Sequence, residues 1–583
     1  MKPEAFVRVA RLAELKAAGP FALSAAGVDV VLARTCNGWR AFGGRCPHQG
    51  ALLGEGELDG ETLVCRNHRW RFALDTGQRD GGPERLASCS VVEREGALFV
   101  DIADLDRSET VVAATRSLDD LPGPRPLPLI GNLHQLVPTK AHLILEEWAA
   151  RYGSTYQFWM GRKRIVATTD PASIEHVLRA RPDTFRRSEN LDRILSELGV
   201  HGVFNAEGAA WRPLRKLSVS ALAQRNLHRL FPNIQRVAGR VKMRWQRAAN
   251  SGDTLDVVEE LTRYTVDVTM LLVFGHDANT VEQEGDLIQR ELEVILPAIN
   301  RRLFAFVPIW RYVQTPSDRR LKRALANVRA WLQGLLTEAR ARSKAEPKQI
   351  QKSTNLVEAM VVASDENGEP FSDDAIMSNL LTMLIAGEDT TAFTLAWAIH
   401  QLCDSPQWAS EIRREADKIL GDSIVAGTPD LAGLLLRAGA VVSETMRLRP
   451  VGPTSFLDAN VDASLGEYIV PKQTTVSALL RPAATDSANF FDPLAFRPER
   501  WLEDPNGPHN VSAYMPFGTG PRMCPGRSLA FLEMKTFVSM LYKNFDVERV
   551  GDSAAVSELY NGFTMAPSGL TVRLHCRTAS SPG

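Results

Sequence analysis

The sequence has almost no net charge. Its 68 Lys and Arg residues nearly balance its 69 Asp and Glu residues, which leaves a formal charge of -1 at pH 7. A surface that binds nucleic acid needs a clear basic excess. The composition therefore argues against DNA or RNA as a partner.

Cysteine is scarce, and its number is odd. Seven cysteines are spread over 583 residues, which is not the dense, even set that a disulfide framework requires. We therefore expect a reducing compartment, in which some of the cysteines serve as metal ligands.

Long apolar runs are missing as well. The first 20 residues lack the apolar core of a signal peptide, and the most apolar stretch, residues 377–403, is interrupted by Glu388 and Asp389. We interpret that stretch as a buried helix rather than a membrane span. No G-x-G-x-x-G fingerprint typical of flavin or nicotinamide binding follows a strand. The lack of a signal peptide and of a membrane span predicts a soluble, cytoplasmic protein. The lack of the fingerprint predicts that flavin and nicotinamide are bound by another protein.

The remaining composition, 44% hydrophobic and 23% charged, is that of a globular protein, and 583 residues suggest two to four domains. In residues 1–104, short apolar runs flank Asn37-Gly38, which is a hairpin signal because both residues tolerate positive φ. Residues 105–120 are predicted to be a linker. From residue 121 spaced prolines and then helical periodicity continue to residue 583. We predict a multidomain protein, with a small all-β domain before a mainly α (α+β) domain.

The first candidate site is Cys46-Pro-His48, followed after sixteen residues by Cys65-Arg-Asn-His68. Two thiolates and two imidazoles on separate loops are a ligand set that zinc also accepts. Structural zinc pairs usually have two to four intervening residues, however, and Cys46 and His48 have one.

The pattern resembles a Rieske [2Fe–2S] centre, in which two cysteines hold one iron and two histidines the other. The resemblance covers residues 1–104 and implies that Cys46, His48, Cys65 and His68 bind the cluster. High-potential members of the family add a cysteine to each loop, but this chain has Ala51 and Asn67 there, so it is similar to the ferredoxin type. Arg69 stands where the family usually has glycine.

A Rieske domain can also supply a mononuclear iron oxygenase domain, which needs a nearby pair of histidines and a carboxylate. The histidines after residue 68 are isolated in the sequence, with no pair at i, i+4 or i, i+5. We therefore exclude that class of oxygenase.

The second candidate site is "FGTGPRMCPGR", residues 517–527, with Phe517, Gly520, Arg522, Cys524 and Gly526. Its glycines let the backbone come close to a flat ligand. Cys524 precedes an amphipathic helix, and the positive end of that helix stabilises a thiolate.

This loop is similar to the haem-binding loop of the cytochrome P450 family, and the resemblance covers roughly residues 120–578. It implies haem b with Cys524 as axial ligand, Phe517 shielding the sulfur, and a thiolate that favours O–O cleavage. Arg522, together with Trp211 and Arg215 of "AAWRPLRK", is expected to contact the haem propionates. Leu457 stands where many members have an arginine for that purpose.

Other motifs of the family follow in its order. "SETMR" with Glu444 and Arg447, and "FRPERW" with Arg500, match a structural Glu-Arg-Arg triad. "LLTMLIAGEDTTAFTLAWAI", residues 380–399, resembles the family's central helix, where an acid–alcohol pair delivers protons for O2 activation. By position, Asp389 is the acid and Thr390 the alcohol, and Glu388 is expected to point away into an ion pair.

The two resemblances together imply a monooxygenase fused to its own ferredoxin. We expect an NAD(P)H-dependent flavoprotein reductase as a separate partner, and O2 and an apolar small molecule as substrates. Candidate pocket stretches are residues 186–206, 295–310, 382–391, 451–457 and 561–565. Two alternatives stay open: a haem enzyme that uses peroxide or catalyses an isomerisation, and a redox sensor or general electron carrier. The sequence leaves open whether electrons pass within one chain or between chains.

Overall fold

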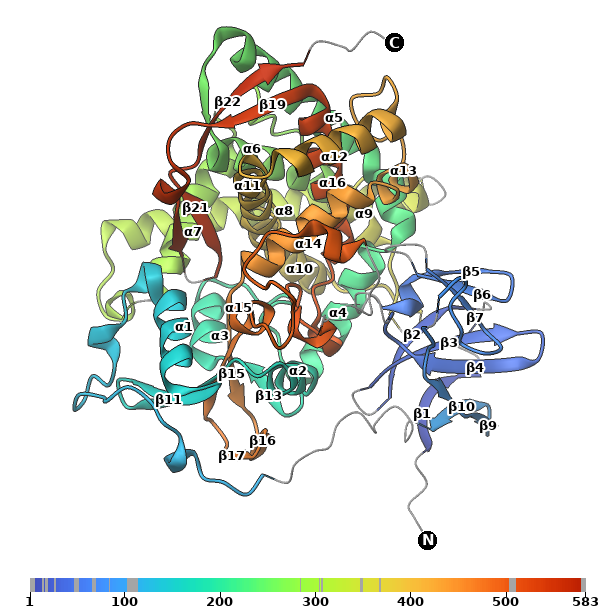
Figure 1. Ribbon diagram of the computed structural model, residues 1–583, viewed down its shortest axis with the longest axis vertical. Helices are drawn as coiled ribbons and strands as arrows, with labels where there is room; N and C mark the ends of the chain where they lie inside the picture. Colours follow the sequence, from blue (N-terminus) through green and yellow to red (C-terminus); the bar gives the residue numbers. More distant parts are fainter. Residues whose placement is uncertain are drawn as a thin grey trace.

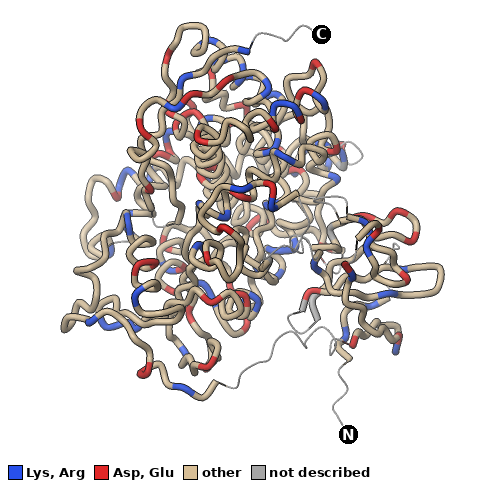
Figure 2. The backbone as a smooth tube through the Cα atoms, viewed as in Figure 1, with Lys and Arg blue, Asp and Glu red and all other residues tan. Residues whose placement is uncertain are grey.

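The structure is a computed structural model. It describes residues 6–12, 15, 19–25, 28–46, 52–65, 70–82, 84–101, 114–283, 285–303, 305, 308–346, 350–365, 368–502, 510–561 and 563–577. A small β-rich N-terminal domain lies to one side of a larger helical domain, next to α2 (Pro171–Arg179) and α4 (Trp211–Ala221) (Figure 1). Basic and acidic residues are mixed along both domains (Figure 2).

The N-terminal domain consists of three antiparallel sheets. Their strand orders are β1-β10-β9, β2-β3-β4-β8 and β5-β6-β7. The strands are β1 Phe6–Arg11, β2 Phe21–Ala25, β3 Val28–Thr35, β4 Gly38–Gly43, β5 Glu57–Asp59, β6 Thr62–Val64, β7 Arg71–Ala73, β8 Ser88–Cys89, β9 Val91–Arg94 and β10 Ala97–Asp101.

Strand β3 is the centre of this domain because both of its faces are buried. Val30 and Leu32 face one apolar cluster, and Val31 and Ala33 face another, as the two-residue period of a strand requires. β3 and β4 form the predicted hairpin, with the turn at Cys36–Asn37, one residue earlier than the sequence signal.

Two larger sheets lie in the helical domain. The five-stranded sheet has the order β11-β12-β18-β15-β13, with β12 and β18 parallel and the other pairs antiparallel; the second sheet has the order β14-β22-β19. The strands are β11 Thr155–Met160, β12 Lys163–Thr168, β13 Phe185–Arg187, β14 Thr254–Asp256, β15 Thr454–Ala459, β18 Thr475–Leu479, β19 Phe545–Arg549 and β22 Thr571–Cys576, with hairpins β16 Ala463–Leu465/β17 Tyr468–Val470 and β20 Ser557–Tyr560/β21 Met565–Ser568.

Most of this domain is helical. Besides α2 and α4, its α-helices are α1 Ala141–Tyr152, α3 Glu189–Glu197, α5 Gln224–Ser251, α6 Val257–Thr269, α7 Leu287–Leu303, α8 Pro316–Ala345, α9 Leu356–Val361, α10 Asp373–Ala386, α11 Asp389–Cys403, α12 Pro406–Leu420, α13 Pro429–Gly433, α14 Leu436–Leu448, α15 Leu480–Ala484 and α16 Arg527–Asn544. None of the described helices is long and apolar enough to cross a membrane.

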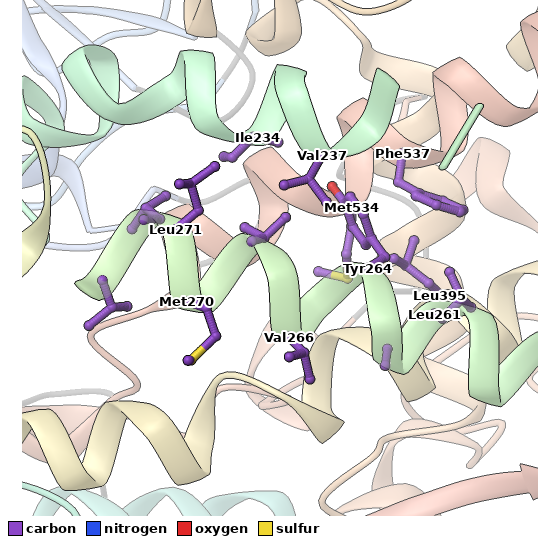
Figure 3. Packing of buried hydrophobic residues seen from close by; sticks show 14 of the residues in the cluster. Ile234, Val237, Leu261, Tyr264, Val266, Met270, Leu271, Leu395, Met534 and Phe537 are labelled. Carbon is purple, nitrogen blue, oxygen red and sulfur yellow. The ribbon is translucent and has the colours of Figure 1, made fainter. Parts of the chain in front are cut away.

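The main core gathers around α6. Tyr264 of α6 packs on Phe537 of α16, with ring centroids 4.8 Å apart, and Leu395 of α11 belongs to the same cluster (Figure 3). Because α11 and α16 are anchored in one apolar core, the two segments that carry the predicted catalytic and haem-binding residues are held relative to each other.

A buried charged network lies between α14 and the loops before the cysteine motif. The Glu444 carboxylate accepts hydrogen bonds from Arg447 at 2.8 Å, from Arg500 at 3.1 Å and from the Trp501 indole at 2.9 Å. Arg447 also donates to the Ala484, Pro493 and Ala495 carbonyls. Glu444 and Arg447 are fully buried, so the charges of the predicted triad are compensated inside the protein.

The predicted helix over residues 380–399 is interrupted. α10 ends at Ala386 and α11 begins at Asp389, with Gly387 and Glu388 between them. A Cβ on Gly387 would lie 2.8 Å from the Thr269 hydroxyl of α6, so a larger residue would require the Thr269 side chain to move. The Thr390 hydroxyl donates to the Ala386 carbonyl at 3.2 Å, a local side-chain bond that competes with the helical ladder.

Candidate active site

The cysteine loop is shaped by its glycines. Gly518 and Gly520 have φ values of +70° and +69°, which favour glycine, and the Cys524 amide donates to the Phe517 carbonyl at 2.9 Å. α16 begins at Arg527, three residues after Cys524. The loop thus presents Cys524 just before the helix, as the motif predicts.

The thiol of Cys524 lies in a polar but enclosed setting. Burial raises the pKa of the thiol, while the backbone amides of Gly526 and Arg527 and the charge of Arg215 lower it. Cys524 as a residue is exposed by accessible surface, so the loop presents it to the space beside α16 although its thiol lies close to the backbone amides. Phe517 lies on the same loop as Cys524 and packs on Phe531 of α16, with ring centroids 5.6 Å apart.

The predicted haem contacts Trp211, Arg215 and Arg522 lie together. The Arg522 guanidinium lies 4.5 Å from the centroid of the Trp211 ring and donates to Glu207 at 2.5 Å. Arg215 donates to the Met523 carbonyl at 2.6 Å, next to Cys524. Burial lowers the pKa of Arg522 to about 10. The positive charges of Arg181 and Arg215 lower this pKa further, and the negative charge of Glu207 raises it.

Two further arginines, missed by the sequence reasoning, complete this cluster. Arg181 is buried and Arg187 is half-buried, and desolvation lowers the pKa of each. Arg187 on β13 pairs in register with Leu457 on β15. The neighbouring strand therefore carries an arginine beside the position where many members of the family have one and this chain has leucine. The only sequence signal is the arginine-rich segment 179–187.

The arginine cluster has more positive charge than its described partners neutralise. Arg181, Arg187 and Arg522 share Glu207, and the Nε and Nη2 atoms of Arg181 and the Nε of Arg522 are buried without a hydrogen-bond acceptor. Buried donors of this kind require an anion or polar partner. The two carboxylates of a haem meet that requirement, so these residues and Cys524 fit the group that the motif implies.

The acid–alcohol pair begins α11. Thr390 and Ala386 are exposed although the surrounding helix is buried. Burial raises the pKa of Asp389 to about 6, against a hydrogen bond from the Asn561 side chain. A carboxyl that titrates near neutral pH is suited to proton transfer. Glu388 is not the expected ion-paired side chain: it is buried, and the charges that act on it are those of Asp389 and Glu293.

The predicted cluster cysteines lie in the N-terminal core. Cys46 and Cys65 are both buried and belong to one cluster with Leu53 and Phe72. Each begins a loop that is closed at its base: Arg45 pairs with Leu52 as a β-bridge, and the Cys65 amide donates to the Trp70 carbonyl at 2.7 Å. The two predicted histidine ligands, His48 and His68, lie outside the described residues.

The two domains meet at the cysteine loop. Arg45, the residue before Cys46, donates through Nη2 to the Thr519 hydroxyl at 2.5 Å and through Nε to Asp29 at 2.8 Å. Asp29 also accepts from Arg179 of α2 at 3.2 Å. A Cβ on Gly520 would lie 2.7 Å from the Arg179 Cα, so α2 and the loop are in close contact. Thr519 is 3% exposed, which shows that this contact excludes water.

Comparison with known proteins gives two family matches. The model of the cytochrome P450 family matches residues 121–574, and that of the Rieske [2Fe-2S] domain matches residues 5–91. Isoflavone 3'-hydroxylase of Medicago truncatula is 27% identical over 485 residues, which are 79% of this chain and 93% of that protein. A bifunctional cytochrome P450/NADPH–P450 reductase of Gibberella moniliformis is 26% identical over 478 residues, 80% of this chain and 42% of that protein.

A solved structure agrees on the fold. The haem domain of cytochrome P450DA matches with a TM-score of 0.70 at 22% identity, over 79% of this chain and 99% of that one. The predicted fold class, a small β-rich domain followed by a mainly helical one, is confirmed.

Proposed function

This chain belongs to the cytochrome P450 family and carries a Rieske [2Fe-2S] domain ahead of the P450 domain, and we propose that the two domains form one electron-transfer unit. The chain is a haem–thiolate monooxygenase, with a haem bound through cysteine and a [2Fe–2S] cluster. The N-terminal domain, when loaded with its cluster, would supply the P450 domain with single electrons received from a separate NAD(P)H-dependent flavoprotein reductase. With two electrons, two protons and O2, an apolar C–H bond becomes C–OH and the second oxygen leaves as water.

Cys524 is proposed as the haem ligand, with Phe517 beside the sulfur. Trp211, Arg215 and Arg522 hold the propionates, and Arg181 and Arg187 add the charge that Leu457 does not provide. The buried guanidinium nitrogens without acceptors support this assignment. Bound there, a thiolate-ligated haem supplies the O–O cleavage chemistry of the reaction.

The contact between Arg45 and Thr519 carries the proposal of a relay within one chain. Arg45 is covalently next to Cys46, a proposed cluster ligand, and Thr519 lies five residues before Cys524. Among the described residues, this route between the two cofactor loops contains a single hydrogen bond.

The predicted linker, residues 105–120, is shorter than expected, because the Arg116 amide donates to the Glu467 carbonyl at 3.0 Å and Leu118 is buried in the core of the helical domain. A tether of about twelve residues, which spans up to roughly 40 Å when extended, keeps the carrier at high effective concentration.

The Asp29–Arg179 ion pair tests this docking through a double-mutant cycle. We expect Arg179→Gln and Asp29→Asn each to slow haem reduction by the reduced cluster by about 3- to 10-fold, since charge pairs at an interface orient the partners. The double variant should be no slower than the slower single variant, because both remove the same pair. Arg193→Gln, which breaks an exposed pair within α3, is the control. Additive losses in stopped-flow traces would show that the two residues do not act together.

Asp389 and Thr390 are proposed to deliver the two protons. The Asp389 carboxyl gains and releases protons near its pKa of about 6, and the exposed Thr390 hydroxyl passes them toward the O2 site. No described cation is among the groups that set the pKa of Asp389, so no positive charge offsets the burial that raises it.

Replacing Thr390 by alanine should uncouple the reaction. We expect the product formed per NAD(P)H to fall by about tenfold or more, since proton-transfer groups contribute roughly 100-fold or more in rate, with hydrogen peroxide accounting for the missing electrons. Thr390→Ser keeps the hydroxyl and should retain most of the coupling. A haem enzyme driven by peroxide would be little affected by either change, so equal product yields in wild type and Thr390→Ala would favour that alternative.

The substrate is proposed to be an apolar organic molecule. Two of the candidate pocket stretches meet, because Phe204 and Phe563 lie with ring centroids 6.2 Å apart. Their aromatic side chains support an apolar lining.

A further inference from the structure

Glu388 is a buried carboxyl that the proton pathway described above does not use. It lies at the break between α10 and α11, directly before Asp389, and is 5% exposed. The Gln289 side chain of α7 donates a hydrogen bond to it. The Glu388 Oε2 and the Gln289 Oε1 are both buried with no hydrogen-bond partner among the described residues. Two buried acceptor oxygens without a donor are costly unless one of them carries a proton.

Among the described residues, the charges that act on Glu388 are negative. Burial, the neighbouring Asp389 and Glu293 of α7 together raise the pKa of Glu388 to about 8, and the Gln289 hydrogen bond opposes them. From α6, the side chain facing the break is the neutral Thr269. With no described cation among these influences, the neutral acid is the stable form at neutral pH.

The acidic neighbour of Glu388 on α7 is in contact with solvent. Glu293 is exposed on α7, one helical turn after Gln289. The charges of Glu293 and Asp389 both act on Glu388, so the three carboxyls lie near one another, with Glu293 exposed on α7 and Asp389 at the start of α11. Exposed carboxylates exchange protons rapidly with solvent, and buried acids hold them.

We propose that Glu388 is a protonated relay residue that resupplies Asp389 with protons taken from solvent at Glu293. The proposal rests on the monooxygenase function given above. When Asp389 has passed its proton to Thr390, the Glu388 hydroxyl gives its proton to the Asp389 carboxylate. Glu388 then takes a proton from solvent by way of Glu293. No electrons move, and each turnover draws two protons through this series. Glu388 acts through Asp389, so it is a positioning and supply residue and not a catalytic one.

Stability against pH gives a readout that does not depend on activity. The ordinary pKa of a glutamate is 4.5, and in the folded chain that of Glu388 is about 8. As pH rises between these values, the unfolded chain releases a proton that the folded chain keeps, so the wild type loses stability across this window. Glu388→Gln removes this contribution. The variant's Tm, compared with that of wild type, should therefore rise progressively from about pH 4.5 to about pH 8, while the contribution of Asp389 remains in both.

The relay is tested by turnover of the same full-length holoenzymes. In Glu388→Gln we expect substrate-dependent turnover to fall about tenfold, less than the 100-fold or more of a group that transfers the reacting proton itself. The solvent deuterium isotope effect on turnover should increase, and the rate of first-electron reduction should not change. Glu293→Gln should show a smaller loss. Glu291→Gln, on the same helix but bonded to Asn327, is the matched control and should behave as wild type.

Two results overturn the proposal. An unchanged Tm profile for Glu388→Gln would show that Glu388 is ionised in the folded chain. A changed Tm profile with wild-type turnover and isotope effect would show that its proton is only structural. Failure of the proposed function looks different: wild type would then form no oxygenated product, whatever the Tm profiles show.

Discussion

Replacing Glu444 by alanine is expected to cost about 3–5 kcal/mol of unfolding free energy, the range found when one partner of a buried ion pair is removed. Arg447 would keep its charge in a site that is fully buried, and Arg500 and the Trp501 indole would each lose an acceptor. Whole domains are stable by only about 5–15 kcal/mol. We therefore expect the haem domain to be unfolded in a large fraction of the variant molecules near body temperature.

The effect should reach the cysteine loop. Trp501, which donates to Glu444, packs on Tyr514 with ring centroids 4.5 Å apart, and Tyr514 lies three residues before Phe517. Haem content should therefore fall together with stability. Arg437→Ala on the same helix is the control, since its pair with Glu411 is exposed and worth less than about 1 kcal/mol. Denaturant unfolding of the full-length chains measures the unfolding free energy of both variants. A loss below about 1 kcal/mol for Glu444→Ala would show that the network does not lock the core.

Replacing Cys46 by serine should have the largest effect on electron flow. The variant loses a proposed cluster ligand, and with it the tethered carrier whose effective concentration is worth about 100- to 10,000-fold. Haem reduction driven by NAD(P)H and the reductase should therefore slow by at least about 100-fold. The haem domain has its own core, separate from the cluster that contains Cys46, so dithionite should still reduce the haem and give the same CO-bound spectrum.

Cys36 provides the matched control for that variant. It lies in the turn between β3 and β4 of the same domain and is exposed. Cys36→Ser should reduce the haem at the wild-type rate and keep the Rieske EPR signal that Cys46→Ser loses. If haem reduction in Cys46→Ser stayed at the wild-type rate, the cluster would not be on the electron path, and a redox sensor would become the better interpretation of the domain.

Local patterns predicted the fold class, the β3–β4 hairpin and the loop that carries Cys524. Strand alternation and the Asn37-Gly38 signal predicted the β3–β4 hairpin, because turn chemistry acts over a few residues. The spacing around Cys524 predicted a loop before a helix, since glycine conformations and the helix start are local properties.

Features that depend on distant partners could not be predicted. Arg187 faces Leu457 only because β13 pairs with β15 across about 270 residues of sequence. Gly387, at the break between α10 and α11, lies against Thr269 of α6, and the contact of Arg45 with Thr519 joins residues of different domains. Propensity and periodicity contain no information on such pairings. The burial that raises the Asp389 and Glu388 pKa values likewise comes from packing of helices that are separate in sequence.

The central claim, electron transfer from the cluster to the haem of the same chain, is tested most directly by mixing two incomplete chains. Cys46→Ser retains a working haem and Cys524→Ser retains a working cluster. Each is assayed alone and in an equal mixture, with reductase, NAD(P)H, O2 and a substrate that wild type oxidises. If the relay runs within one chain through the Arg45–Thr519 contact, the mixture should form no more product than the variants do separately. Recovery of a large fraction of wild-type product in the mixture would contradict the account and show transfer between chains.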